Sequence, residues 1–448
     1  MDDMKKPEAI PPKKRKFPWW QMMALAVTGQ LAWAVENSWF GTFVFDHIAQ
    51  DARPVAWMTA ASAVTATLTA IFMGTLSDRT RSRYGKRKLF ILFGYILWGV
   101  MTIVFPMTAW FKNLTLSVIM VVLADCLMTF FGSMANDAAF NAWTVDVTPS
   151  NRRGRVEGLL NVAMFIAQII SLTLAGVLID QFGYFRFFYT LGAIVILAGL
   201  VAGLLLPDEP SDHLSKPEKT FWQELSELLQ WRMVTENRML FILLLVIMIS
   251  GIGMQICYPY LVIYVTHNLG YSRSEFALIG GAVMLGSLIL AVPLGGLADR
   301  MNKRKMIIAA IVLSSLGCFL FSLGKSIAFL SVAGLMWQAF YVAISIATVA
   351  WLKDLLPAES RGKFMGIRMI FWVMIPMVIG PFLSVQVLRW FGGGVTAGAD
   401  GAILPQALLF QVGALVALLA ALPLLLIKTD KSNLVHNQTN QQWRNVND

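Results

Sequence analysis

Two stretches of the chain carry the same short pattern, and this repetition constrains the fold more than any other feature. The segment Gly74-Thr-Leu-Ser-Asp78-Arg79 is followed by Lys86-Arg87-Lys88, and Gly295-Gly-Leu-Ala-Asp299-Arg300 is followed by Lys303-Arg304-Lys305. Six further positions recur 208 residues later: Trp143, Asp146, Pro149, Arg153, Gly154 and Gly158 return as Trp351, Asp354, Pro357, Arg361, Gly362 and Gly366. The chain is therefore predicted to be two copies of one unit in the same orientation.

The composition places these units in a membrane. Of the 448 residues, 57% are hydrophobic and only 14% are charged. Apolar runs of about 20 residues are long enough to cross a ~30 Å hydrocarbon core. Twelve such runs are found, at about 19–45, 55–76, 89–110, 115–142, 158–180, 186–206, 239–266, 275–298, 306–324, 328–351, 366–390 and 402–427. The predicted fold is an all-α membrane protein, with twelve transmembrane helices in two parallel six-helix bundles.

The basic residues predict which helix ends face the cytoplasm. Of the 36 Lys and Arg, 30 fall in the tails and loops of one side and six on the other. Since an excess of Lys and Arg marks cytoplasmic loops, we expect both termini in the cytoplasm and the protein in the plasma membrane. The predicted parts are a basic tail (1–18), a six-helix bundle (19–206), a linker with a short amphipathic helix (207–238), a second bundle (239–427) and a disordered tail (428–448).

Other roles for the charges and cysteines are less favoured. The net charge of +10 and the run Pro12-Lys-Lys-Arg-Lys16 are typical of nucleic-acid partners or nuclear import, but we interpret these cations as anchors at an anionic lipid surface and expect no nucleic acid. Cys126, Cys257 and Cys318 lie far apart and predict no disulfide and no metal site. The sequence has no Walker A motif and no visible nucleophile–base pair, so we expect neither an enzyme nor a cofactor.

Three carboxylates lie inside predicted helices: Glu36, Asp125 and Asp137. No Lys or Arg lies at a matching depth, and an intramembrane charge is costly and usually functional. Desolvation without a cation favours the protonated form. These acids are therefore predicted to load and release a proton, with an interhelical hydrogen bond as the structural alternative for each.

Polar and aromatic side chains in the helices are candidates for binding a ligand. On the tenth predicted helix, Gln338, Tyr341, Ser345 and Thr348 share one face by helical spacing, with Trp337 beside them. Hydroxyls and amides bind sugar hydroxyls, and an aromatic face covers the C–H face of a sugar. The alternative is that these groups bond one helix to another. The predicted substrate-binding residues are Asn37, Asn136, Asn161, Gln168, Gln255, Tyr258, Trp337, Gln338, Tyr341 and Ser345.

The repeated Asp-Arg pattern predicts a gate at the cytoplasmic helix ends. An Asp there can accept hydrogen bonds from the first amides of a neighbouring helix, while arginines pair with acids across the closed face. Several weak pairs together can bias a two-state equilibrium. The predicted gate residues are Asp78, Arg79, Arg83, Arg87, Asp146, Arg153, Asp299, Arg300, Asp354 and Arg361.

Twelve helices in two parallel repeats, with Gly-x-x-x-Asp-Arg after helices 2 and 8, resemble the major facilitator superfamily. Within it, Asp78-Arg-Thr-Arg-Ser-Arg83-Tyr-Gly85-Lys-Arg87-Lys-Leu-Phe is similar to the helix 2–3 loop of the glycoside–pentoside–hexuronide cation symporters, and Trp33-Ala-Val-Glu36-Asn37 resembles the first helix of the sucrose and disaccharide proton symporters. Sodium-coupled members carry two helix 2 carboxylates where this chain has Ala66 and Ala70. The resemblance therefore implies proton rather than sodium coupling.

The leading hypothesis is a monomeric sugar symporter, in which protons and a disaccharide or other glycoside cross the bilayer by alternating access. One alternative is an efflux antiporter for drugs or metabolites on the same fold, because acidic and aromatic residues also suit cationic drugs. The other is a membrane sensor that binds a ligand without transporting it. The sequence leaves the solute and the direction of transport open.

Overall fold

The computed structural model describes residues 17–149, 152–208, 238–355, 367–392 and 402–425. The predicted amphipathic helix of the linker and almost all of both predicted tails lie outside these residues. Ten helices in the described part are long and apolar enough to cross a membrane. The first predicted crossing is built from three shorter consecutive pieces, and one long helix holds two crossings, so the twelve predicted crossings all appear as helices.

The first half contains six crossings. In chain order its elements are α1 (Trp19–Val35), η1 (Glu36–Phe40), α2 (Gly41–His47), α3 (Ala52–Arg79), α4 (Lys88–Val104), η2 (Phe105–Trp110), α5 (Leu114–Gly132), η3 (Ser133–Phe140), α6 (Asn141–Val147) and α7 (Arg153–Leu204). Within α7 the backbone breaks at Gly183, whose φ of 78° lies in the left-handed region that glycine tolerates best. This break separates the fifth and sixth crossings.

The second half repeats the arrangement. Its elements are α10 (Arg238–Cys257), η5 (Tyr258–Tyr260), α11 (Leu261–Ile263), η6 (Tyr264–Asn268), α12 (Arg273–Arg300), α13 (Lys303–Leu323), α14 (Ile327–Leu355), η8 (Ile370–Met374), α16 (Ile375–Phe391), α17 (Leu408–Leu419) and α18 (Ala421–Leu425). Pro259 lies in η5, where the α-helix of this crossing gives way to a 3-10 turn. The all-α fold with two bundles is confirmed.

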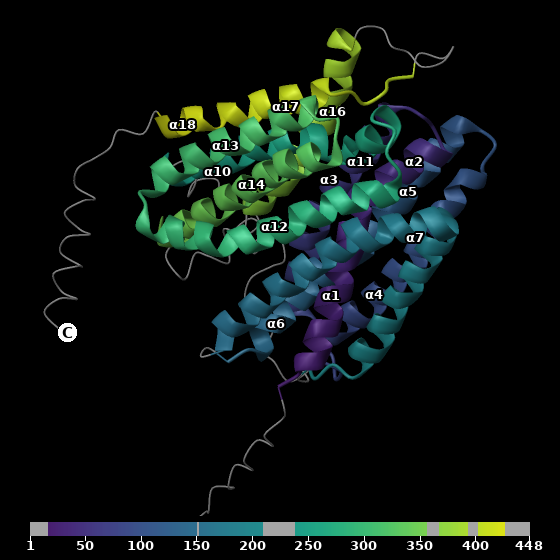
Figure 1. The fold of residues 1–448 in the computed structure, drawn as a ribbon. Helices are drawn as coiled ribbons and strands as arrows, with labels where there is room; N and C mark the ends of the chain where they lie inside the picture. Colours follow the sequence, from purple (N-terminus) through teal and green to yellow (C-terminus); the bar gives the residue numbers. More distant parts are fainter. Residues whose placement is uncertain (1–16, 150–151, 209–237, 356–366, 393–401, 426–448) are drawn as a thin grey trace, which may run out of the picture.

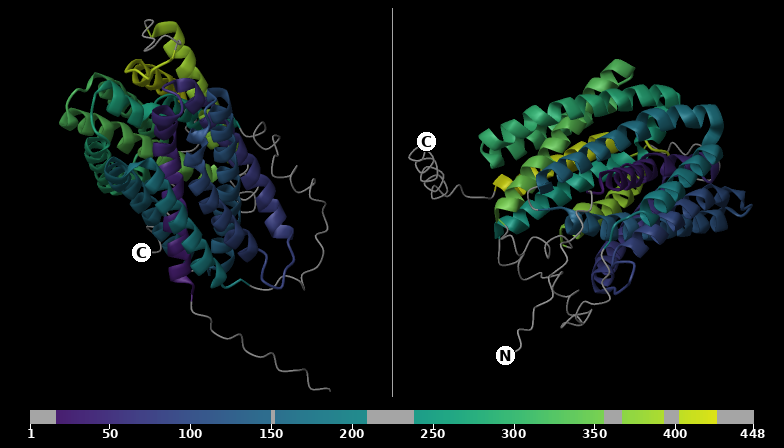
Figure 2. Two further views of the ribbon diagram at one scale, coloured as in Figure 1. Left: turned by 90° about the vertical axis from the view of Figure 1, so that its right-hand side faces the viewer. Right: turned by 90° about the horizontal axis from the view of Figure 1, so that it is seen from below.

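The two halves meet at one end and diverge toward the other. In Figure 1 the helices of the second half lie above those of the first, the two groups meet near α2 and α11, and they spread apart toward α6 and α18. In both views of Figure 2 the long helices of each half run side by side. We call the end with Asp46, Asp180, His267 and Arg273 the closed end, and the opposite end, with Lys86 and Arg87, the basic end.

The apolar core follows the same division. One cluster of buried side chains fills the first half and continues into the second half through Tyr260, Ile263 and Phe276. A separate cluster, which includes Leu243 and Ile307, lies within the second half. The shared core therefore joins the halves at the closed end, where the Tyr260 hydroxyl also donates a hydrogen bond of 3.1 Å to the Ala52 carbonyl.

Candidate functional site

A small cavity lies between the two halves and collects polar side chains from both. Its volume is about 30 Å³, above the minimum that a cavity needs to hold one water molecule. The lining residues come from the first crossing, α3 and α5 on one side, and from α10, η5 and α16 on the other: Glu36, Asn37, Gly41, Val55, Met58, Thr59, Ser62, Asp125, Gln255, Tyr258, Pro259 and Met377. We call this the central cavity.

Glu36 is held in the central cavity by two hydroxyl groups. It is the first residue of η1, a π-helical turn that interrupts the first crossing, and such turns are frequent at functional sites. Its Oε1 lies 3.1 Å from Ser62 Oγ and 3.1 Å from Thr129 Oγ1, and the two hydroxyl oxygens are 2.7 Å apart. Its Oε2 is buried and has no hydrogen-bond partner among the described residues.

Asp125 shares the central cavity with Glu36. Its side chain, on α5, is 1% exposed. Its Oδ1 finds no hydrogen-bond partner in the described part of the chain. None of the twelve residues that line the cavity is Lys, Arg or His. Two acids therefore line one small cavity with no cation in its wall.

Asp137 belongs to a different cluster, further along the same crossing. It lies in η3, a second π-helical segment, and accepts hydrogen bonds from Ser133 Oγ at 3.0 Å and from Asn136 Nδ2 at 3.4 Å. The Tyr95 hydroxyl lies 3.1 Å from Asn136 Oδ1. A side chain on Gly29 would meet both Asn136 and the Tyr95 hydroxyl at 2.6 Å, so glycine lets α1 approach this cluster. Asn136 thus lies among interhelical contacts in the first bundle.

Of the predicted substrate-binding residues, Asn37, Gln255 and Tyr258 line the central cavity. Asn161 is exposed and donates to the Glu157 carbonyl, one helical turn back in α7. Gln168 is half-buried on the same helix, and Gln338 and Ser345 are half-buried on α14. The central cavity therefore gathers a subset of the predicted binding residues.

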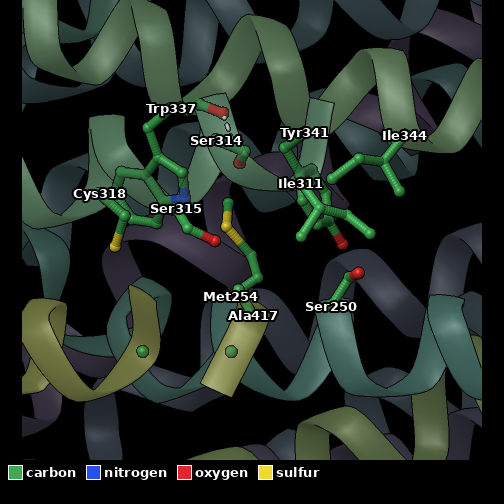
Figure 3. A pocket seen from close by; sticks show the side chains of 12 residues that line it. Ser250, Met254, Ile311, Ser314, Ser315, Cys318, Trp337, Tyr341, Ile344 and Ala417 are labelled. Atoms are coloured by element: carbon green, nitrogen blue, oxygen red, sulfur yellow. Dashed lines mark hydrogen bonds between the residues drawn. The ribbon is translucent and has the colours of Figure 1, made fainter. Parts of the chain in front are cut away.

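Trp337 and Tyr341 line a second cavity, inside the second bundle. Figure 3 shows both side chains beside Ser314, Ser315 and Met254, and the Ser314 hydroxyl donates a 3.0 Å hydrogen bond to the Trp337 carbonyl. The cavity measures about 10 Å³, at the lower limit for a single water molecule. In this conformation the two residues are interior groups of the bundle.

The predicted gate residues of the first half form a cluster at the basic end. Arg87, which is 3% exposed, pairs with Asp78 and lies 3.4 Å from Asp146, while Lys86 lies 3.2 Å from Asp146. The amides of Arg87 and Lys88 donate to Asp208, so an acid does bond the start of a neighbouring helix, although sequence reasoning did not select this one. The cluster joins helices of the first half.

The other gate residues are less fully placed. The Arg83 guanidinium stacks on the neighbouring Tyr84 ring, and Arg79 and Arg153 lie at the end of α3 and the start of α7. The side chains of Asp299, Arg300 and Asp354, and the whole of Arg361, lie outside the described residues. The predicted pairing across the two halves at this end stays a prediction.

The closed end carries a network that sequence reasoning missed. Arg273, in the second half, pairs with Asp46 and with Asp180 of the first half, the latter at 3.3 Å. His267 Nε2 lies 3.0 Å from Asp46, and the Tyr184 hydroxyl donates to Asp46 at 3.0 Å. We call these residues the latch. Burial disfavours the charged form of Asp46, but hydrogen bonds from His267 and Arg273 hold its pKa below the usual range.

Two features of the sequence pointed to the missed residues. Ser62 lies four and eight positions before Ala66 and Ala70, hence on the same face of α3. Asp46, Asp180 and Arg273 are charges at the ends of apolar runs, where pairing across a gate is as plausible as at the basic end. Hydroxyl groups and terminal charges, as well as buried carboxylates, therefore mark contacts between helices in this sequence.

Comparison with protein families gives a match over nearly the whole chain. The model described as Major Facilitator Superfamily matches residues 22–261 and again 243–446. Among curated relatives, an uncharacterized MFS-type transporter of Methanocaldococcus jannaschii is 26% identical over 314 residues, 68% of this chain and 74% of that protein. An anhydromuropeptide permease of Escherichia coli is 26% identical over 228 residues, 48% of this chain and 45% of the permease. A multi-drug resistance efflux pump homologue of Lactococcus lactis is 28% identical over 193 residues, 42% and 45%.

Solved structures of the same fold agree with these matches. A mutant of the nucleoside transporter NupG superposes with a TM-score of 0.72 at 13% identity, covering 91% of this chain and 99% of that one. A bacterial homologue of the human lysosomal transporter Spinster, in an inward-facing and occupied conformation, superposes with a TM-score of 0.67 at 14% identity, covering 92% and 95%. Together with the repeated family match and the two bundles, this shows that the chain belongs to the major facilitator superfamily of transporters.

Proposed function

We propose that this protein is a proton-coupled transporter of a small neutral polar solute of the sugar or glycoside class. The observation that carries the proposal is the pair of acids, Glu36 and Asp125, in a cavity between the halves whose wall holds no cation. Acids inside a membrane protein mark proton or substrate pathways. Amide and hydroxyl groups of Asn37, Gln255 and Tyr258 share the cavity and suit a solute rich in hydroxyl groups.

Counting hydrogens supports a proton on Glu36. Its Oε1, Ser62 Oγ and Thr129 Oγ1 form a triangle with edges of 3.1, 3.1 and 2.7 Å. Each hydroxyl supplies one hydrogen, so an ionised carboxylate leaves one edge without a donor. A protonated Glu36 supplies the third hydrogen and closes the ring. Loss of that proton removes one hydrogen bond of the ring, so proton transfer would change how Glu36 is held by Ser62 and Thr129.

The proposed orientation places the basic end in the cytoplasm. The Lys and Arg of the loops favour this direction, and α18, the last described helix, lies toward that end (Figure 1). The latch then closes the side away from the cytoplasm, and the divergence of the helices corresponds to an inward-facing state. We propose the plasma membrane as the location and one chain as the transporting unit.

A second candidate is proton-driven efflux of an organic cation. The resemblance to a multi-drug resistance efflux pump homologue favours it. The cavity also combines two acids with Met58, Met377 and Tyr258, and methionine adapts to ligands of different shape. This candidate uses the same acids, but a cation instead of a neutral solute.

The test is uptake by the purified full chain in proteoliposomes. A panel of labelled mono- and disaccharides and nucleosides is offered under an imposed pH gradient, first without sodium and then with it. Accumulation of one neutral solute that collapses with a protonophore would support the first proposal. Extrusion of a fluorescent organic cation, with no neutral solute accumulated, would support the second. Accumulation that needs sodium would contradict proton coupling.

A further inference from the structure

An apolar groove opens on the side of the first bundle, at a distance from the central cavity. Its volume is about 390 Å³, and it lies between α1 and the two limbs of α7. The break at Gly183 turns the chain between these limbs, so Phe182 and Arg186 stand on opposite sides of the turn. Leu174 and Phe182 on its walls are 51% and 52% exposed, whereas Val35 on its floor is 1% exposed. The groove is thus a hollow in the surface that faces the bilayer.

A single charged side chain lies in the lining of this groove. Arg186 is at its mouth, next to the closed end, and the rest of the lining is apolar apart from Thr190. Arg53 and Arg273 at the same end pair with Asp51 and with Asp46, but Arg186 shows no ion pair among the described residues. From Arg186 to Ile194 the groove follows eight residues of helix, or about 12 Å.

We propose that the groove binds a phospholipid from the leaflet at the closed end. The phosphate lies on Arg186, and one acyl chain lies along the apolar floor toward Ile194. The occupant must be amphiphilic, because a cation stands at the mouth and the remaining length is apolar. A guanidinium presents a planar fork of donors that matches a phosphate in two parallel hydrogen bonds. Long basic side chains also reach naturally toward the headgroup level.

The bound chain also touches the helix that carries the proton site. Val35 forms part of the groove and directly precedes Glu36, where α1 changes into the π-helical turn η1. The lipid would therefore support the turn from which Glu36 enters the central cavity. The binding itself does not depend on the proposed transport activity, so it is tested without a transport assay.

The experiment uses the full chain in liposomes that contain a phosphatidylglycerol with a photoactivatable group in its acyl chain. After illumination, labelled residues are mapped by mass spectrometry. We expect labelling to concentrate on the part of α7 between Leu174 and Ile194. Arg186→Gln should reduce this labelling about fivefold, the factor that one basic residue near an anionic membrane surface is worth. Arg389→Gln removes an exposed cation from α16, outside the groove, and should leave it unchanged.

A second pair of variants tests the groove without changing charge. Leu174→Trp fills the groove and should also reduce labelling, while Leu197→Trp, at a 61% exposed position of α7 outside the groove, should not. Even labelling of all bilayer-facing residues would overturn the proposal. So would a loss with Leu174→Trp but none with Arg186→Gln, which would indicate an uncharged apolar ligand. A cross-linked dimer through this face would assign the groove to a second copy. Each variant is first checked for monodisperse elution.

Discussion

At the scale of single residues, Glu36 combines two properties that a proton carrier needs. One oxygen is held by Ser62 and Thr129, and the other is buried without a partner among the described residues. Glu36→Gln keeps an oxygen for the two hydroxyls but removes the titratable proton. We expect the variant to lose accumulation driven by a pH gradient, while exchange of labelled for unlabelled solute continues.

The matched control is Glu275→Gln, which removes an exposed carboxylate at the start of α12. Glu275 completes a capping box with Ser272, and glutamine serves in the same motif, so transport should be unchanged. Both variants are compared in proteoliposomes with equal amounts of protein. Accumulation at the wild-type level in Glu36→Gln would remove the proton role from this residue.

The sequence singles out an acid for attention where its depth inside an apolar run is unusual. Glu36 and Asp125 stood out because both are acids inside apolar runs, and both line the central cavity. Ser62 did not stand out, because hydroxyl groups are common in membrane helices and only a neighbouring acid distinguishes this one. The pairing of His267 with Asp46 could not be predicted from the sequence, because it depends on how the two halves meet.

At the scale of helices, the sequence predicts where the crossings lie, but it does not predict the π-helical segments within them. Apolar length predicted the crossings, and these appear. The segments η1, η3, η6 and η8 interrupt the first, fourth, seventh and eleventh crossings, and no periodicity announced them. Two of the three membrane acids, Glu36 and Asp137, lie in such segments. The directions of these two side chains could therefore not be derived from an ideal helical wheel.

Helix contact gives a prediction for stability at Gly253. A Cβ there would meet the backbone nitrogen of Ala417 at 2.6 Å, whereas a Cβ on Gly295 would meet nothing within 4 Å. Alanine is the better helix former, so Gly295→Ala should leave the melting temperature unchanged or raise it. Gly253→Ala should lower it, because forced overpacking costs about 1–3 kcal/mol. Thermal unfolding in detergent measures both. A rise in both variants would show that α10 and α17 separate easily.

At the scale of the whole molecule, the repeat predicted two parallel bundles but not their state. Because both halves carry the same pattern at corresponding helix ends, the repeat is compatible with closure of the space between the halves at either side of the membrane. The latch decides the state in this structure, because Arg273 reaches Asp46 and Asp180 across the two halves. The gate predicted from the basic motifs lies at the basic end, whereas the pairing across the halves described here lies at the opposite end.

Arg273 is therefore expected to control how often the closed end opens. Arg273→Gln removes two ion pairs that are partly buried, which should shift the equilibrium toward separation by about 2 kcal/mol, between the values of exposed and buried pairs. Spin labels at the exposed positions Gln181 and Lys325, one in each half, report the separation by pulsed distance measurement. Lys112→Gln, which removes another exposed cation, is the control. An unchanged distance distribution in Arg273→Gln would mean that the apolar core closes this end without help.

The same labels test how the latch responds to acid. Because Arg273 and His267 lower the pKa of Asp46 in the closed state, closure gains stability that is fully present above the ordinary carboxyl value of about 3.9 and is lost as the pH falls through the lowered value. Acidification from pH 7 to about 5 should therefore leave the closed population intact. Asp46→Asn should open the closed end at every pH. Loosening of the wild-type latch already at about pH 6 would contradict this assignment.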